Sequence, residues 1–169
     1  MFEVLAFVFE NYAHGQACPE LAHLERKLNS VGFEADEIQE ALAWLDDLNL
    51  AARGLQPSSG DLRSAPTPGP ALVERLVQSP HSMRVYATYE QNHLGSDCLG
   101  FITFLERAGV LPAYMREIVM DRAMAAPGGP VPLDDFKIIV LMVFWSLGLE
   151  PDALMLDELC EDRALRVAH

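Results

Sequence analysis

The feature of this sequence that most constrains its fold is a continuous apolar run near the C-terminal end. Residues 136–147 read FKIIVLMVFWSL, and only Lys137 and Ser146 interrupt the apolar side chains. These twelve residues are too few to cross a bilayer, because a membrane-spanning helix takes roughly 18–20 apolar residues. A helix that is apolar around nearly its whole circumference needs packing neighbours on every side. We therefore expect a helical bundle built around this run.

Hydrophobic periodicity predicts three helices in the first 53 residues. Apolar side chains recur three and four residues apart over 2–13, 19–30 and 34–48, which is the spacing of one helix face. Gly15 and Gly32 follow the first two stretches and suit the left-handed conformation in which helices often end. The third stretch carries the longest apolar stripe, so it is the best-defined helix of this part.

A segment rich in proline and glycine separates these helices from the rest of the chain. Residues 54–70 hold four prolines and three glycines with few apolar side chains, so they predict a loop. Beyond it, Met83–Tyr86 is a short β-prone stretch that could pair with Arg53–Leu55. Three helices, a loop and a strand pair are the order of parts in a winged helix. A plain helical bundle in which Met83–Tyr86 is merely extended fits the same pattern.

The second half is predicted to be helical throughout. Besides the apolar run, periodic stretches predict helices over 97–108, 112–126 and 151–165. Thr88 and Gln91 have the spacing of a capping box, and Asp134 is placed to cap the apolar helix. We therefore predict a mainly α fold in which an N-terminal three-helix unit, winged-helix-like in its order of parts, precedes a C-terminal helical bundle. The predicted boundaries are 1–53 for the first unit, 54–80 for the loop and 81–169 for the second unit.

The charge of the chain disfavours polyanionic partners. It carries 12 basic and 25 acidic side chains, a formal net charge of -13, which opposes binding to nucleic acid or to anionic membrane surfaces. In a DNA-reading winged helix the third helix would enter the major groove, yet residues 28–52 hold six acids and no Lys or Arg. We expect instead an acidic docking surface for a basic protein partner. Its candidate residues are Glu34, Asp36, Glu37, Glu40, Trp44 and Asp47.

The alternative is a nucleic-acid-associated winged helix that contacts anions through the middle of the chain. Residues 54–87 hold three bases and two acids, and they are the only part that is not net negative. Arg63, Arg75 and Arg84 are the candidate anion contacts in that reading.

No motif in the sequence predicts catalysis, a metal or a cofactor. Gly-rich phosphate loops, nucleophile elbows and H-E-x-x-H are absent. His14, Cys18 and His23, or His93 with Cys98, do not supply the four convergent ligands of a structural zinc site. We therefore expect a non-enzymatic protein without cofactors. Three widely spaced cysteines, with neither a C-x-x-C motif nor a signal peptide, predict reduced thiols and a cytoplasmic location.

Two side chains lie at unusual positions on their predicted helices. Arg122 falls within the apolar side of helix 112–126, where a guanidinium must be paired. Glu106, Asp134 and Asp135 are its candidate partners in a structural ion pair that would join neighbouring helices. Trp44 lies near the boundary of the apolar stripe of helix 34–48, where it would either pack on the second half or contact a partner.

The sequence also resembles the bacterial Smg family, small proteins without an assigned biochemical activity. The resemblance covers nearly the whole chain. It is carried by Met1-Phe-Glu-Val-Leu5, Gly32-Phe33 with Ile38, Ala41-Leu42 and Trp44-Leu45, Ser82-Met-Arg-Val-Tyr86, Gly100-Phe101, Phe104-Leu105-Glu106, Arg116-Glu117, Arg122, Leu133-Asp-Asp135 and Val140-Leu-Met-Val143. The resemblance implies a cytoplasmic bacterial protein, encoded in some genomes near DNA-processing and topoisomerase genes, and it assigns no substrate or active site. Ala87-Thr-Tyr-Glu90 departs from the Thr-Pro-Glu that is expected after Tyr86.

Overall fold

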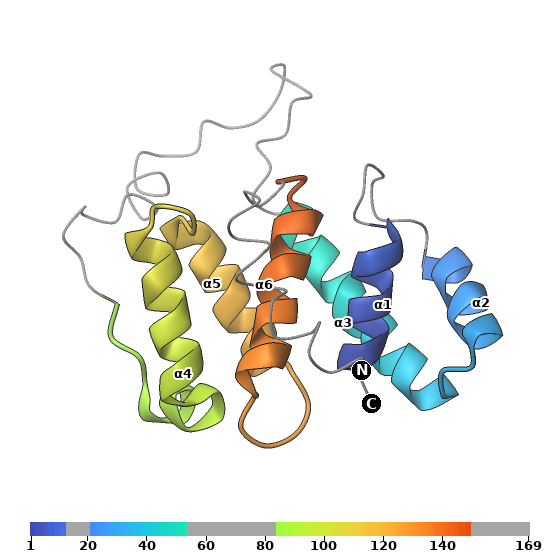
Figure 1. Ribbon diagram of the computed structural model, residues 1–169, viewed down its shortest axis with the longest axis horizontal. Helices are drawn as coiled ribbons and strands as arrows, with labels where there is room; N and C mark the ends of the chain where they lie inside the picture. Colours follow the sequence, from blue (N-terminus) through green and yellow to red (C-terminus); the bar gives the residue numbers. More distant parts are fainter. Residues whose placement is uncertain (13–20, 54–83, 150–169) are drawn as a thin grey trace, which may run out of the picture.

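The structure is a computed structural model that describes residues 1–12, 21–53 and 84–149 (Figure 1). Six helices occupy these ranges: α1 (Phe2–Tyr12), α2 (Leu21–Val31), α3 (Ala35–Arg53), α4 (Thr88–Arg107), α5 (Ala113–Met124) and α6 (Leu133–Ser146). No β-strand occurs in the described ranges, so the mainly α class is confirmed. The predicted helix over 151–165 and the loop over 54–80 lie wholly outside the described residues.

Helix α6 occupies the centre of the molecule, as its apolar sequence predicts. Every residue from Phe136 to Phe144 is buried, including Lys137. In Figure 1, α6 lies between α4 and α5 on one side and α1 and α3 on the other. Helix α6 packs against all four of these helices. The N-terminal helices α1 and α3 therefore supply neighbours of α6 besides those from the second half. None of the helices in the described ranges combines the length and the apolar character that a membrane span needs.

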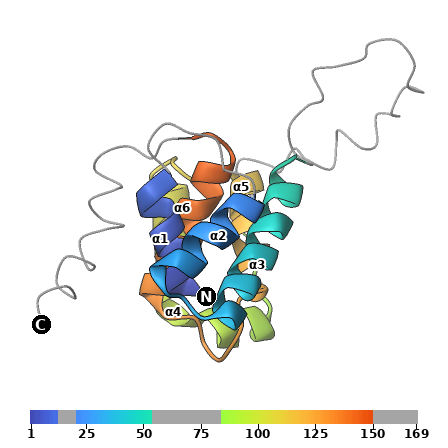
Figure 2. The ribbon, with the colours of Figure 1, turned by 90° about the vertical axis from the view of Figure 1, so that its right-hand side faces the viewer.

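One hydrophobic core extends across the described residues. It joins Leu5 and Leu45 from the N-terminal helices to Ile102, Val119 and Ile139 from the later ones. Helix α3 contacts both α5 and α6, whereas α2 packs on α3 and lies between α1 and α3 in the view of Figure 2. Helices α1 and α3 thus cover one side of α6, and α4 and α5 cover the other.

The end of α5 is held by ring nitrogens from two other helices. Nε1 of Trp44 in α3 donates to the carbonyl oxygen of Arg122 at 3.0 Å. Nε2 of His93 in α4 lies 3.1 Å from the carbonyl oxygen of Ala123. The last carbonyls of a helix have no partner within it, so these side chains complete hydrogen bonding at the end of α5. They also fix α3 and α4 relative to α5.

The helix boundaries correct two of the predicted caps. Helix α4 begins after Ala87, whose N–H donates to Oε2 of Glu90 at 2.7 Å, so Thr88 and Gln91 do not form the predicted capping box. Pro132, and not Asp134, precedes the first residue of α6. Within α4, Gly95 has a φ of +70° and breaks the regular helix. Glycine adopts a left-handed φ more easily than other residues. This break at Gly95 agrees with the sequence prediction of a separate helix that begins after this position.

The winged-helix arrangement is not confirmed. Arg53 is the last residue of α3, and residues 84–87 belong to neither a helix nor a strand. Leu55 and Met83, the other ends of the two predicted strands, lie outside the described residues.

Candidate functional site

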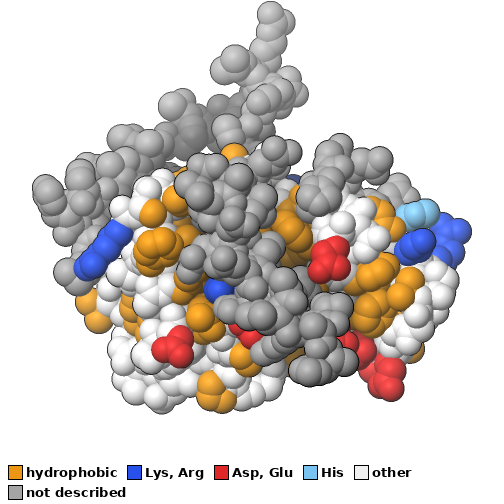
Figure 3. All heavy atoms as spheres, in the orientation of Figure 1, with side chains coloured by type: hydrophobic (Ala, Val, Ile, Leu, Met, Phe, Trp, Pro, Cys, Tyr) orange, Lys and Arg blue, Asp and Glu red, His pale blue; other side chains and the backbone are white. Residues whose placement is uncertain are grey.

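The acidic surface predicted on the third helix exists as a corner of the molecule. Asp36 and Glu40 lie one turn apart on the exposed side of α3, and Glu34 precedes the helix in the turn from α2. Glu3, Glu34 and Glu37 line a hollow of about 460 Å³ together with Val31, Gly32 and Phe33. We call Glu3, Glu34, Asp36, Glu37 and Glu40 the acidic corner. Figure 3 shows acidic side chains at its lower right, where Figure 1 places the start of α3.

Local backbone structure assembles this corner. Gly32 has a φ of +105°, which ends α2 and redirects the chain into α3 within three residues. The ring of Phe33 packs edge-on against Phe7 of α1, with 5.6 Å between centroids. This contact brings the start of α3 to the first turn of α1, so Glu3 joins the carboxylates of the turn. The α-amino group of Met1 lies 3.6 Å from Oε1 of Glu37.

Trp44 corrects the predicted docking surface. Its side chain is buried, with 5 % of the residue exposed, and its indole N–H donates to the Arg122 carbonyl. A buried side chain with its only donor satisfied cannot contact a partner protein, so Trp44 is a core residue and not a docking residue. The alternative that the sequence left open, packing of Trp44 on the second half, is the one that the structure adopts.

Arg122 is paired, but with other partners than the sequence predicts. Its guanidinium contacts Asp121 at 2.8 Å and Asp47 of α3 at 3.3 Å. The predicted partner Glu106 binds Arg116 instead. Asp134 and Asp135, at the start of α6, form no ion pair with Arg122. Asp47, predicted as a docking residue, therefore takes part in a contact between α3 and α5.

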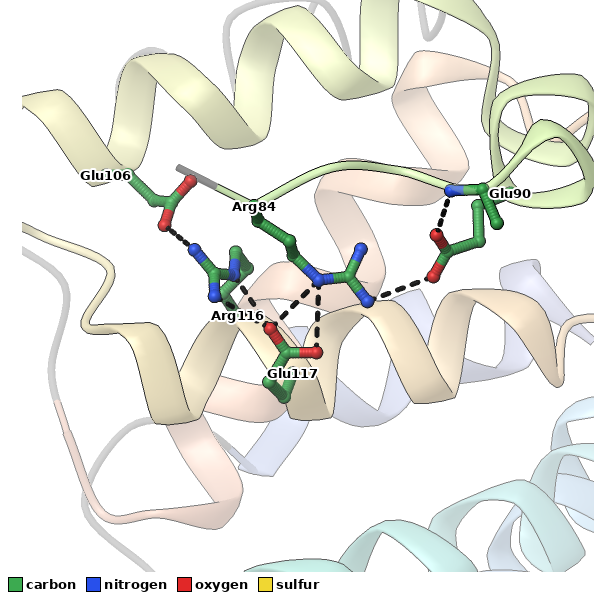
Figure 4. A network of polar contacts seen from close by, with 6 residues as sticks. Arg84, Glu90, Glu106, Arg116 and Glu117 are labelled. Atoms are coloured by element: carbon green, nitrogen blue, oxygen red, sulfur yellow. Dashed lines mark hydrogen bonds and ion pairs between the residues drawn. The ribbon is translucent and has the colours of Figure 1, made fainter. Parts of the chain in front are cut away.

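A second cluster of charges joins the segment before α4 to α4 and α5 (Figure 4). Oε1 of Glu117 accepts hydrogen bonds from Nε of Arg84 at 3.0 Å and from Nε and Nη2 of Arg116 at 2.9 and 2.8 Å. Arg116 also binds Glu106, and Arg84 also binds Glu90 at 3.0 Å. We call these five residues the ion-pair cluster. Two guanidinium groups thus meet three carboxylates in a continuous chain.

Burial makes this cluster structurally important. Arg116 is 3 % exposed and Glu90 is 7 % exposed, so both charges depend on their partners for solvation. Burial alone would raise the pKa of Glu90, but the hydrogen bonds from Arg84 and the Ala87 N–H outweigh it, and the pKa lies below its usual value. Burial opposes the charge of Arg84, yet Glu90 and Glu117 raise its pKa further.

The cluster accounts for Arg84, which the sequence offered as an anion contact. Its guanidinium is already shared between two carboxylates and lies 4.9 Å from the ring centroid of Tyr86. Burial and the nearby Glu106 raise the pKa of Tyr86. Arg63 and Arg75, the other candidate anion contacts, lie outside the described residues. Periodicity did not identify the cluster, although Arg84, Glu106, Arg116 and Glu117 all fall in stretches that carry the Smg resemblance.

The pKa of Glu90 predicts a specific pH dependence of stability. Because its folded-state pKa is lowered, the Glu90 carboxylate stabilises the fold above the unfolded-state pKa of about 4.3, and this contribution is lost as the pH falls through the folded-state value. We expect Glu90→Gln to cost about 1–2 kcal/mol at neutral pH. The difference from wild type should shrink as urea unfolding is repeated towards pH 3. A difference that is constant across this range would contradict the ion pair.

The predicted metal ligands and thiols lie only partly within the residues that the structure describes. The described residues contain no group of three or more His, Cys, Asp or Glu side chains arranged to hold a metal ion. His14 and Cys18 lie outside them. Cys98 is buried, its thiol lies 3.4 Å from the Val131 carbonyl oxygen, and burial raises its pKa to about 11. A thiol in this state is a poor nucleophile.

Fold and clusters together define a small helical protein with a central apolar helix and an ion-pair cluster joining its outer helices. A family model described as "Protein of unknown function (DUF494)" matches residues 1–169, and the chain belongs to this family. Proteins named "Protein Smg homolog" from Methylibium petroleiphilum and Leptothrix cholodnii are each 52% identical over 169 residues, with 100% of both chains covered. A third, from Bordetella avium, is 46% identical over 170 residues, again with 100% of both chains covered. The predicted resemblance to the Smg family is confirmed. No solved structure matches the chain.

Proposed function

We propose that this chain is a non-enzymatic, cytoplasmic binding protein whose acidic corner receives a basic segment of another protein. The observation that carries the proposal is the hollow between α1 and the α2–α3 turn, which combines three glutamates with apolar Val31 and Phe33. A lysine or arginine side chain has the matching composition, because an aliphatic stem can lie on apolar surface while the charged end meets carboxylates.

The surrounding charges support the same partner. Residues 28–52 contain no Lys or Arg, and the α-amino group of Met1, 3.6 Å from Glu37, offsets only part of the negative charge of the corner. The described residues of the first 53 hold nine acids and three bases. A potential of one sign steers oppositely charged partners and raises association rates. The loss of Trp44 as a contact residue means that charge and the Val31–Phe33 surface, not a large aromatic side chain, would provide recognition.

A nucleic-acid role is the weaker proposal. It requires bases that are available to phosphates, and Arg84, the candidate within the described residues, is bound to Glu90 and Glu117. Contacts with phosphates depend on unpaired Lys and Arg side chains that release counterions. The acidic corner would oppose such contacts at the helix that a winged helix uses for recognition.

Binding can be tested with a defined basic ligand. A labelled peptide of alternating lysine and leucine residues is titrated against the full chain, and amide chemical shifts are mapped by NMR. We expect shifts to concentrate at residues 31–40 and affinity to fall with added salt. Glu34→Gln with Glu37→Gln should weaken binding about tenfold.

The matched control removes two carboxylates elsewhere. Glu25 and Asp46 are exposed and lie outside the acidic corner, so Glu25→Gln with Asp46→Asn should change the affinity less than about twofold. If both double variants lost affinity equally, the peptide would be held by general charge attraction, and the proposed site at the acidic corner would be refuted. Tighter binding of duplex DNA than of the peptide would favour the alternative role.

A further inference from the structure

The outer side of α4 carries a pattern that is complementary to itself. Beyond the break at Gly95, Asp97, Gly100, Phe104 and Arg107 follow one another at spacings of three, four and three residues. This spacing places them in one stripe along a helix, as in the contact seam of a coiled coil. All four are exposed, and Figure 3 shows hydrophobic side chains beside basic and acidic ones on the left, where Figure 1 places α4. We call this stripe the α4 seam. Gly100, Phe104 and Arg107 of the seam line a hollow of about 700 Å³ together with Tyr86.

Gly100 is the least expected residue of the seam. It lies in the interior of a helix, where glycine is less favourable than alanine. Its φ is not positive, and a Cβ atom added to it would meet nothing within 4 Å. Neither backbone conformation nor packing within the described residues therefore calls for glycine here. Because Gly100 has no side chain, it leaves an indentation in the helix surface, and another protein chain can approach the helix closely there.

Phe104 supplies the matching projection one turn away. The residue is 55 % exposed, although its ring stacks on Phe101 with 6.4 Å between centroids. Gly100 and Phe104 are placed symmetrically about position 102, and so are Asp97 and Arg107. In two antiparallel helices related by a two-fold axis at position 102, each residue of a pair faces the other member of that pair.

The charges of the seam point to the same arrangement. Arg107 has no hydrogen-bond or ion-pair partner among the described residues, and Asp97 contacts only the hydroxyl of Ser96 at 3.2 Å. The other charges of this side, in the ion-pair cluster, already bind one another. Asp97 and Arg107 are opposite in sign and lie at opposite ends of the seam. A second copy of the chain would neutralise both at once.

We propose that two copies of this chain associate through their α4 seams, antiparallel and with two-fold symmetry. Phe104 of each copy enters the indentation at Gly100 of the other, and Arg107 of each pairs with Asp97 of the other. The contact is one helix pair between chains of net charge -13, so it is a weak dimer whose Kd is on the order of 10–100 μM. This association uses a different face from the acidic corner and does not depend on the proposed function.

The test is sedimentation equilibrium of the full chain between about 1 μM and about 1 mM, where a weak dimer becomes populated. Arg107→Asp alone, or Asp97→Arg alone, places like charges at both ends of the seam and should weaken the dimer at least about tenfold. The double variant D97R/R107D exchanges the charges and should restore the dimer to within about threefold of wild type. Asp46→Arg makes the same change at an exposed position of α3 and should leave it unaffected.

Gly100→Leu separates association from folding. Leucine is the better helix former and its Cβ meets no neighbour, so we expect an unchanged or higher melting temperature. The same side chain fills the indentation and should weaken the dimer at least about tenfold. A chain that stays monomeric at about 1 mM would overturn the proposal. So would a dimer that persists in Gly100→Leu, or one that the charge exchange fails to restore.

Discussion

Trp44→Ala is expected to lower the free energy of unfolding by about 3–5 kcal/mol, a large share of the stability of a domain of this size. Trp44 is 5 % exposed and lies on α3 where this helix meets α5. Truncation leaves a cavity in the core and removes the N–H that binds the Arg122 carbonyl. Urea unfolding followed by far-UV circular dichroism measures the loss without relying on tryptophan fluorescence.

Two further variants divide this effect into packing and hydrogen bonding. Trp44→Phe keeps an aromatic ring but loses the donor, so it should cost about 1–2 kcal/mol. Leu50→Ala, on the same helix, truncates a residue that is 72 % exposed and should change stability by less than about 0.5 kcal/mol. If Trp44→Ala were no more harmful than Leu50→Ala, Trp44 would not belong to the core.

The position of Trp44 illustrates what periodicity can and cannot establish. The stripe from Ile38 to Leu48 correctly predicts the helix and its buried side. Trp44 lies at the edge of that stripe, and whether an edge residue is covered depends on a neighbour from elsewhere in the chain. Here the neighbour is α5, 78 residues away at Arg122. Contacts over such separations leave no local pattern in a single sequence.

The same limit explains why the sequence pairs Glu106 with Arg122 and not with Arg116. On the helical projection of 112–126, Met115, Ile118, Val119 and Ala126 place the apolar side around Arg122. In the structure Met120 and Ala123 are also buried, which turns the buried side towards Arg116. Arg116 is 3 % exposed, whereas the side chain of Arg122 is 11 % exposed and its partners are mostly solvated. The chemical expectation of a paired arginine within an apolar face was sound, and the rotation of the helix decided which residue fulfils it.

The central helix was predictable for the opposite reason. A helix as apolar as the run from Phe136 to Phe144 must be buried on all sides. The composition of this run is therefore enough to predict that it lies in the core. The identity of its neighbours was only half predicted, because α1 and α3 are themselves amphipathic and could have covered any apolar surface. Because one core joins α1–α3 to α4–α6, the free energy of unfolding should respond to each contact between these two groups of helices.

Arg116→Met is expected to cost about 3 kcal/mol, because removing the buried member of an ion pair leaves its partner Glu106 without compensation. The substitution keeps an unbranched side chain of similar length at a position that is 3 % exposed, so little packing is lost. Glu106 would then lose the guanidinium that it binds, whereas Glu117 would keep Arg84. Arg116→Lys should be intermediate, since an ammonium group cannot bind both carboxylates in the planar geometry of Arg.

Arg122→Met is the matched control for this prediction. It makes the same change on the same helix, but the carboxylates of Asp47 and Asp121 are each 64% exposed, so water replaces the lost partner and the cost should stay below about 1 kcal/mol. Adding Glu106→Gln to Arg116→Met should recover part of the loss, because it removes an uncompensated charge. Equal costs for the two arginines, or no recovery in the double variant, would mean that the cluster contributes through packing and not through charge.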